Sequence, residues 1–293
     1  MLYKSLLVVG LLALSQAASA SFIVTQTNDA SVLAQTILGS GISLSGTPTL
    51  TGNAAQSGTF QNFTTGVFTN PITGTSGQVN MASGIILSSG PVVDAMGNYT
   101  GGASSNLGGL GDAALTAIAG YPTFDAVSLS FDFVPDADTL FIQFLFLSTE
   151  YPNYVNTQYN DVFGFFVNGT NVALVPGTTD PVTINSINLG RPTGTNPSNA
   201  QYFTQYSNSS TPFNYGGATI LLTANATVNP GVLNNFRFAV ADGSDGILDS
   251  AILIGAGQFT TVNPGGDVPE PGTWALIGTG LVSLVLFRRR KQA

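Results

Sequence analysis

The sequence predicts an all-β fold: a single β-sandwich or jelly-roll-like domain with one or two short helices, preceded by a signal helix and followed by a C-terminal transmembrane helix. Three observations favour it. The middle of the chain contains many short apolar runs, either unbroken or alternating with polar residues, as in strands. Turn-forming residues, mainly Gly, Asn, Ser and Pro, separate these runs. No repeat period is evident, which argues against a solenoid or a propeller.

The first 20 residues have the parts of a secretory signal peptide. Lys4 supplies a positive charge, residues 6–14 are apolar, and the Ala-Ser-Ala segment at 18–20 is a cleavage site of small residues. The apolar run is shorter than the roughly 20 residues that span a bilayer. We therefore expect a mature chain that begins at Ser21, with a retained signal anchor as the alternative.

Two short helices are expected in the first half of the chain. Asn28 or Asp29 can cap a helix whose apolar residues follow at helical spacing, and Gly39 ends it. A second helix is expected from Asp112, as its N-cap, to Gly120.

Strands account for most of the remaining elements. Segment 41–84 is rich in Gly, Ser, Thr and Asn and predicts loops with short strands, and 98–111 predicts a Gly-rich loop. Further strands are predicted at 127–133, 140–147, 161–167, 172–174, 182–187, 218–223, 235–241 and 250–254. These elements form one extracellular domain over 21–262, with a linker at 263–267.

The charge distribution restricts the class of partner. Five of the seven basic residues lie in the two terminal segments, so that residues 21–267 keep only Arg191 and Arg237. Two cations against fourteen carboxylates give this stretch a formal net charge of −12. A surface this acidic repels nucleic acid and attracts metal cations or basic partners.

The chain contains no Cys and no His, which excludes thiol chemistry, Ser-His-Asp triads and histidine-ligated zinc. A carboxylate pair for glycoside hydrolysis stays open, with Glu150 and an Asp such as Asp161 as acid and nucleophile or base. The other interpretation of Glu150 is a metal ligand or a structural hydrogen-bond acceptor. Sugar binding by exposed aromatic rings is a further hypothesis, with core packing as its alternative. The aromatic residues concerned are Tyr151, Tyr154, Tyr159, Tyr202, Phe203 and Tyr206.

Calcium is the cofactor that the polar residues favour. Ca²⁺ prefers hard oxygen ligands, and two clusters supply them at 150–161 and 242–249. Glycines between the carboxylates of the second cluster allow the backbone to turn so that several oxygens converge, although the spacing is not that of an EF-hand. An acidic β-turn without metal is the alternative. The candidate ligands are Glu150, Asn160, Asp161, Asp242, Asp245 and Asp249.

The C-terminal segment 268–293 is predicted to be a sorting and anchoring tail. The box Val268-Pro269-Glu270-Pro271 precedes an apolar helix at 273–287 and a basic end, Arg288-Arg289-Arg290-Lys291. That helix would rise about 22 Å, slightly less than the ~30 Å hydrocarbon core, and the positive-inside rule places the basic end in the cytoplasm. The tail resembles the PEP-CTERM sorting signal of Gram-negative bacteria. The resemblance implies processing by an exosortase, a membrane helix that is only transient, and a link to exopolysaccharide.

The domain itself resembles the choice-of-anchor L family. The resemblance is densest where Phe144-Leu145-Phe146-Leu147-Ser148-Thr149-Glu150-Tyr151-Pro152 is followed by Tyr159-Asn160-Asp161-Val162-Phe163-Gly164, and Ala239-Val240-Ala241-Asp242 and Ile247-Leu248-Asp249-Ser250-Ala251 look like its closing segment. Thr149 stands where the family tends to carry a second acidic residue. The resemblance implies a surface location and no established activity. We therefore expect an exported, non-enzymatic binding or structural module at the cell surface, outer envelope or matrix of a Gram-negative bacterium, linked to biofilm or exopolysaccharide.

Overall fold

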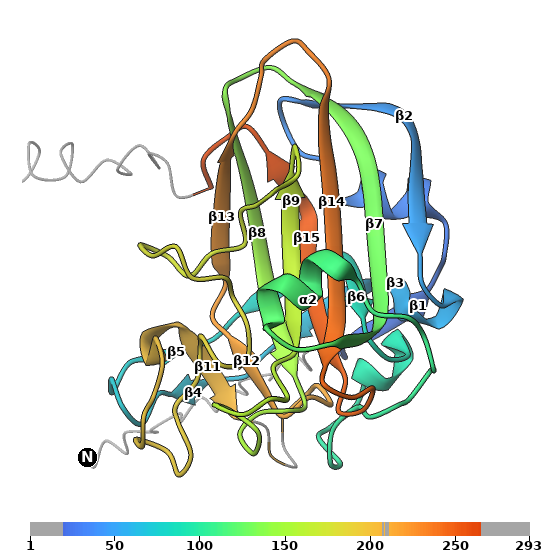
Figure 1. The fold of residues 1–293 in the computed structure, drawn as a ribbon. Helices are drawn as coiled ribbons and strands as arrows, with labels where there is room; N and C mark the ends of the chain where they lie inside the picture. Colours follow the sequence, from blue (N-terminus) through green and yellow to red (C-terminus); the bar gives the residue numbers. More distant parts are fainter. Residues whose placement is uncertain (1–19, 207, 209–210, 265–293) are drawn as a thin grey trace, which may run out of the picture.

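Two antiparallel β-sheets pack face to face in the computed structural model, which describes residues 20–206, 208 and 211–264 (Figure 1). The larger one, sheet A, has eight strands and the smaller one, sheet B, has five. The predicted all-β class is confirmed. In sheet A the order is β1 (Ile23–Gln26), β3 (Ser57–Thr64), β6 (Asn80–Ser88), β15 (Ser250–Thr260), β8 (Thr139–Ser148), β12 (Gly217–Thr219) and β11 (Phe203–Tyr206), and β13 (Leu222–Thr227) also pairs with β8. In sheet B the order is β10 (Thr170–Asn171), β9 (Val162–Val167), β14 (Asn234–Gly243), β7 (Thr123–Pro135) and β2 (Ile42–Thr51). A separate pair is formed by β4 (Phe68–Thr69) and β5 (Ser76–Gly77).

Both predicted helices are present and are capped as expected. The helix α1 (Ala30–Ile37) begins after Asp29, whose carboxylate accepts from the N–H groups of Ser31 and Val32. The helix α2 (Ala113–Ala119) begins after Asp112 and ends at Gly120, which adopts the left-handed conformation that favours glycine. Within the described residues there are also three short 3₁₀ turns: η1 (Ala54–Gln56), η2 (Val92–Ala95) and η3 (Ala200–Tyr202).

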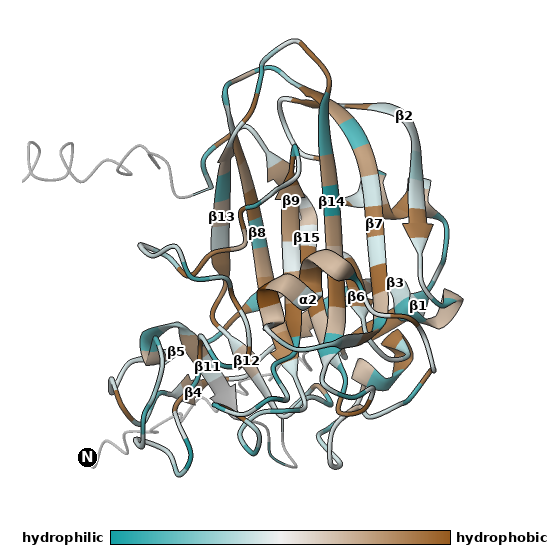
Figure 2. Cartoon of the chain, viewed as in Figure 1, coloured by the Kyte–Doolittle hydropathy of each residue, from teal (hydrophilic) through white to brown (hydrophobic). Residues whose placement is uncertain are grey.

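The main core lies between the two sheets, where the strands β7, β8, β9, β14 and β15 are strongly apolar (Figure 2). Phe163 of β9 shows how the sheets interlock, because its ring packs on Phe144 and Phe146 of β8, with centroid separations of 5.1 and 5.3 Å. The opposite, outer face of sheet A carries a second core that includes Leu145 and Leu147. The helix α2 covers the outer face of sheet B.

The strand predictions need three corrections. The predicted strand 218–223 is interrupted, because β12 ends at Thr219 and β13 begins at Leu222. Segments 172–174 and 182–187 form only isolated bridges, Leu174 to Pro181 and Val162 to Thr183, rather than strands. Pro181 has no N–H to donate to a ladder, which limits the pairing there. Segment 41–84 contains more strand than expected, namely β2, β3 and β6. Of these, β2 is an edge strand, where few apolar residues are needed, whereas β3 and β6 lie inside sheet A.

No helix within the described residues is long and apolar enough to cross a membrane. Residues 1–19 of the predicted signal peptide and the whole predicted tail at 268–293 lie outside the described residues.

An ion pair fastens α2 to sheet B. Arg237 donates from Nη1 to the Asp112 carboxylate at 2.6 Å, and its guanidinium lies 4.4 Å from the ring centroid of Phe166. Burial tends to raise the pKa of Asp112. The hydrogen bonds from Arg237 and from the N–H groups of Leu115 and Ala114 outweigh that tendency, so the pKa is lower than the ordinary 3.8.

Asp112→Asn is expected to lower the free energy of unfolding by about 0.5–1 kcal/mol at pH 7, because asparagine keeps the helix cap but loses a partly screened ion pair. A depressed carboxyl pKa stabilises the folded state above the ordinary value of 3.8, and this contribution is lost as the pH falls through the folded-state pKa. Urea denaturation of both proteins at about pH 7 and about pH 2 checks this. A difference that persists unchanged at the lower pH would contradict it.

Candidate functional site: a buried carboxylate cluster

At one end of the sandwich, the lower end in Figure 1, the inward faces of the strands change from apolar to polar. Side chains two positions apart on a strand share a face, so the inward-facing side chains of each strand can be followed to the end of that strand. The last inward-facing residue at this end is polar on four strands: Ser148 follows Phe146 on β8, Asp161 precedes Phe163 of β9, Asp242 follows Val240 on β14, and Ser250 precedes Ile252 on β15. All four of these polar residues are buried. The sequence thus closes this end of the core with carboxylates and hydroxyls.

Asp161 joins three strands at this end. One of its carboxylate oxygens accepts from the N–H of Gly243 at 2.9 Å, and the other accepts from the Ser250 hydroxyl at 2.6 Å. Asp161 precedes β9, Gly243 ends β14, and Ser250 begins β15 in the opposite sheet. This carboxylate therefore connects sheet B to sheet A.

Asp242 has no comparable partners. Its side chain is fully buried, and neither carboxylate oxygen has a hydrogen bond. The Ser89 hydroxyl is close enough to lower the pKa of Asp242, but it donates to the Ser250 carbonyl and accepts from the Ser250 N–H. Glu150, just after β8, is 1 % exposed and has a buried Oε2 that is also without a partner.

Burial is the first cause of the raised pKa of each carboxyl in this cluster. For Glu150 and Asp242 the charge of Asp161 is the next cause that raises it. For Asp161 the hydrogen bonds from Ser250 and Gly243 lower the pKa but do not offset burial. The cluster therefore favours neutral carboxyl groups or a bound positive charge over three bare carboxylates.

A second pair of polar groups lies on the outer face of sheet A at the same end. Asp249 accepts from the Ser105 N–H at 3.1 Å through Oδ1, whereas its Oδ2 and the Thr149 hydroxyl have no hydrogen-bond partner. A side chain at Gly90 would lie 1.8 Å from Asp249 Oδ2, so this contact requires glycine. Burial, together with the charges of Asp94 and Asp125, raises the pKa of Asp249 to about 7.

A family model described as the choice-of-anchor L domain matches residues 23–260. The chain belongs to the choice-of-anchor L family. The PEP-CTERM protein-sorting motif matches residues 267–291, so that both resemblances predicted from the sequence are confirmed. No curated protein matches the chain at a significant level. An anchor-type domain followed by this motif indicates an exported cell-surface protein of a bacterium, and the motif is a sorting signal that exosortase processes.

The choice-of-anchor L domain brings some of the predicted ligands together and separates others. Asp161 lies within electrostatic range of both Glu150 and Asp242 at the inward end of the sandwich, whereas Asp249 points to the other side of sheet A. Asp245 lies in the loop after β14 and is only partly buried. Among the residues that the structure describes, no three Asp, Glu, His or Cys side chains are placed to hold one metal ion between them.

The Asn160 side chain is already occupied by the backbone. Its amide group donates to the Ala119 carbonyl at 3.1 Å, and its carbonyl oxygen accepts from the Asn185 N–H at 3.0 Å. Asn160 therefore positions the loop before β9 rather than presenting a free oxygen to the cluster.

Asp125 is a member of the cluster that our sequence prediction did not include. It is 1 % exposed, and its charge contributes to the raised pKa of both Asp242 and Asp249. It accepts from the N–H groups of Leu107 and Gly109 and thereby holds the Gly-rich loop against the sandwich. The alternating pattern of β7 does not reach Asp125, because the strand bulges between Phe124 and Val127 and Asp125 has a φ of 49°. Only its residue type and its place just before the predicted strand 127–133 could have indicated it.

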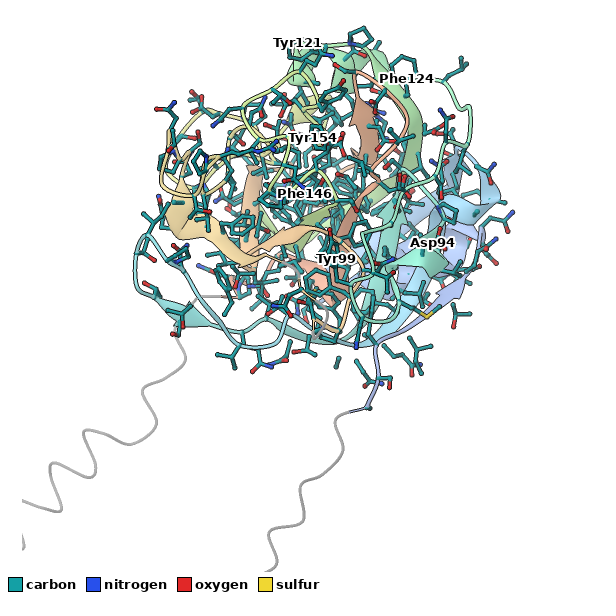
Figure 3. All side chains as sticks on the ribbon, turned by 90° about the horizontal axis from the view of Figure 1, so that it is seen from below. Asp94, Tyr99, Tyr121, Phe124, Phe146 and Tyr154 are labelled. Carbon is teal, nitrogen blue, oxygen red and sulfur yellow. The ribbon has the colours of Figure 1, made fainter. Side chains whose placement is uncertain are left out.

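The aromatic residues proposed to bind sugar divide into two groups. Tyr151 and Phe203 are buried, and the Tyr151 hydroxyl donates to the Ile187 carbonyl at 2.7 Å. Tyr159 and Tyr202 are half-buried, and the side chain of Tyr206 lies outside the described part. Tyr154 is 37 % exposed. Figure 3, which views the molecule from below, shows Tyr154 at the same end of the sandwich as the carboxylate cluster, together with Tyr121 and Phe124.

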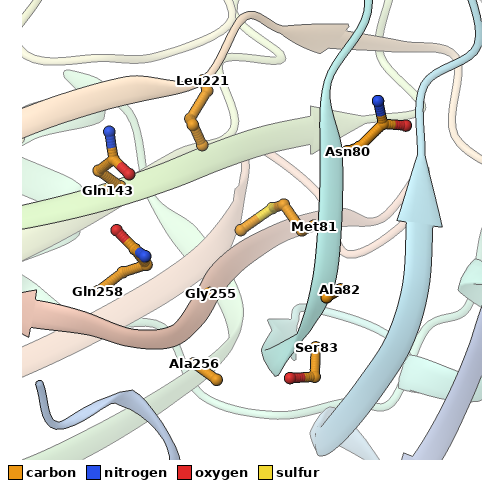
Figure 4. A pocket seen from close by; sticks show the side chains of 9 residues that line it. All are labelled: Asn80, Met81, Ala82, Ser83, Gln143, Leu221, Gly255, Ala256 and Gln258. Atoms are coloured by element: carbon orange, nitrogen blue, oxygen red, sulfur yellow. The ribbon is translucent and has the colours of Figure 1, made fainter. Parts of the chain in front are cut away.

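The domain also has an uncharged cavity of about 220 Å³ on the outer face of sheet A (Figure 4). It opens where β15 bulges away from β8, since the pairing passes from Ile254 directly to Phe259. The side-chain amides of Asn80, Gln143 and Gln258 line it, and none of its nine lining residues is charged.

Proposed function

We propose that this protein is a non-catalytic binding and structural module of the surface or extracellular matrix of a Gram-negative bacterium, where it contributes to biofilm or exopolysaccharide architecture. In this proposal, exosortase processes the tail and the membrane helix at 273–287 is a temporary anchor. The observation that carries the polysaccharide assignment is the amide-lined cavity beside the bulge of β15.

The chemistry of this cavity suits a neutral sugar. A side-chain amide presents a donor and an acceptor together, which matches neighbouring hydroxyl groups on a sugar ring. Met81 and Leu221 supply apolar surface beside the amides of Gln143 and Gln258. The net charge of −12 over residues 21–267 repels an anionic polymer, so the cavity favours a neutral polysaccharide.

The burial of the carboxylates supports a non-catalytic role. A glycosidase needs both carboxyl groups within reach of the scissile bond. Glu150 is 1 % exposed and Asp161 is fully buried, so that neither reaches a bound polymer. This burial disfavours the alternative of a hydrolase that uses Glu150 and Asp161.

The cavity hypothesis predicts that the double variant Gln143→Ala, Gln258→Ala binds a neutral polysaccharide about tenfold more weakly than the unaltered chain, because it loses two hydrogen-bonding amides, worth about 1.4 kcal/mol together. Affinity electrophoresis of the full-length chain in gels containing dextran, laminarin or galactomannan measures this. The matched control is Gln201→Ala, an exposed glutamine outside the cavity.

Equal retardation of the double variant and the unaltered chain in every gel would contradict the assignment of the cavity. Release of reducing sugar by the unaltered chain, abolished in Glu150→Gln, would support the hydrolase instead.

A further inference from the structure

We propose that the inward carboxylate cluster contains a divalent-cation site, centred on Asp242 and bordered by Asp161, and that Ca²⁺ is the ion it takes. This site is independent of the proposed polysaccharide cavity, which lies on the outer face of sheet A. The two proposals can therefore fail separately.

The unpaired oxygens carry the proposal. Within the described residues, five buried side-chain atoms have no hydrogen-bond partner, and they belong to Thr149, Glu150, Asp242 and Asp249. All four residues lie where the central strands of the sandwich end or begin. Buried polar groups in folded proteins are nearly always paired. Three of these oxygens, Glu150 Oε2 and both carboxylate oxygens of Asp242, belong to the inward cluster, and a fully buried carboxylate with no partner for either oxygen indicates a ligand.

No basic side chain of the described chain neutralises this cluster. Arg237 pairs with Asp112 on the outer face of sheet B, and Arg191 donates to the Asn153 carbonyl. Burial of an unpaired carboxylate is costly, so the positive charge must come from bound protons or from a bound cation. Asp242 lies opposite Asp161, because Ala241 pairs with Val162 in the ladder of β14 and β9 and Gly243 donates to the Asp161 carboxylate. An ion there would compensate both carboxylates at once.

The donor atoms select the kind of ion. The chain has no Cys and no His, so every side-chain ligand available is a hard oxygen. Because no three acidic side chains are placed around one point in the described chain, the remaining ligands have to be hydroxyl oxygens, backbone carbonyls or water. Ca²⁺ accepts such mixed and irregular sets of six to eight oxygens at roughly 2.3–2.6 Å, whereas Mg²⁺ demands a near-ideal octahedron. The hydroxyls of Ser148 and Ser250 lie on the same inward face.

Thermal melting of the full-length chain, followed by circular dichroism, tests the site. We expect 1 mM CaCl₂ to raise the melting temperature by about 5–10 °C over EDTA, the shift for an ion present at roughly 100 times its dissociation constant. Mg²⁺ at the same concentration is expected to raise it less. Asp242→Asn should abolish the response to Ca²⁺. The matched control Asp180→Asn removes one exposed carboxylate and should keep the response.

Asp242→Asn is expected to remain folded, and in EDTA to melt at or above the temperature of the unaltered chain, because it no longer buries an unpaired carboxylate. Equilibrium dialysis of the unaltered chain against ⁴⁵Ca²⁺ gives a readout that needs no variant, with about one ion per chain expected. The proposal is overturned if Ca²⁺ leaves the melting temperature of the unaltered chain unchanged, or raises that of Asp242→Asn equally. In the first case protons alone neutralise the cluster.

Discussion

Asp161→Ala is expected to lower the free energy of unfolding by about 2–5 kcal/mol in EDTA. The alanine leaves two buried donors, the Gly243 N–H and the Ser250 hydroxyl, without an acceptor, and each such loss costs about 1–3 kcal/mol. The effect is large because the two donors belong to opposite sheets, so the substitution also removes the connection between them. Urea denaturation, with the midpoint and the slope both fitted, measures the change.

Asp161→Asn is the matched control for this prediction. The asparagine carbonyl can still accept from the Gly243 N–H, and its amide group can donate to the Ser250 hydroxyl, which then acts as an acceptor. We expect it to recover most of the stability that alanine loses. Equal destabilisation by both variants would mean that the Asp161 side chain acts through its charge, and our hydrogen-bond explanation would be wrong.

Phe163→Ala is expected to cost about 3–5 kcal/mol, a large part of the roughly 5–15 kcal/mol by which a domain is stable. Phe163 is fully buried and packs on two rings of the opposite sheet, Phe144 and Phe146, and on Phe165 of its own strand. Its removal leaves a cavity between the sheets that neither strand can close without moving. A fall in the urea midpoint with an unchanged slope would report this loss.

Phe124→Ala provides the comparison for Phe163, because the same ring is removed from a side chain that is 38 % exposed. A cost below about 1 kcal/mol is expected there. If both substitutions cost the same, the main core is not where the stability of this domain resides.

The predictable part of the fold came from strong local signals. Asp29 and Asp112 were recognisable as helix caps because a short side-chain acceptor there satisfies the first free N–H groups, and the structure shows both bonds. The alternation of Val127, Leu129, Phe131 and Phe133 predicted the inward face of β7 correctly. Strands rich in Gly, Ser and Thr, such as β2, were under-predicted because an exposed edge strand carries little hydrophobic periodicity.

The candidate site was predictable in its residue types but not in its geometry. Sequence proximity grouped Asp249 with Asp242, yet they lie on opposite sides of sheet A, because only the pairing of β15 with β8 decides which way Asp249 points. Asn160 had a suitable oxygen, but its tertiary partners, Ala119 and Asn185, are remote in sequence. The direction of a side chain and its tertiary partners depend on how distant strands pair, and a local sequence pattern does not encode this pairing.

The position of β15 has a consequence for the order in which the chain can fold. This strand is the last of the fold, yet it lies between β6 and β8 in the middle of sheet A, and Ser250 pairs there with a partner from the first third of the chain. Without residues 250–260, β6 and β8 each lack their partner on one side, and the main core lacks Ile252, Ile254 and Phe259. The sorting motif begins seven residues after β15 ends. The sandwich therefore cannot be completed without the segment that stands just before the sorting motif, so a chain cut ahead of residue 250 would lose the centre of sheet A together with the motif.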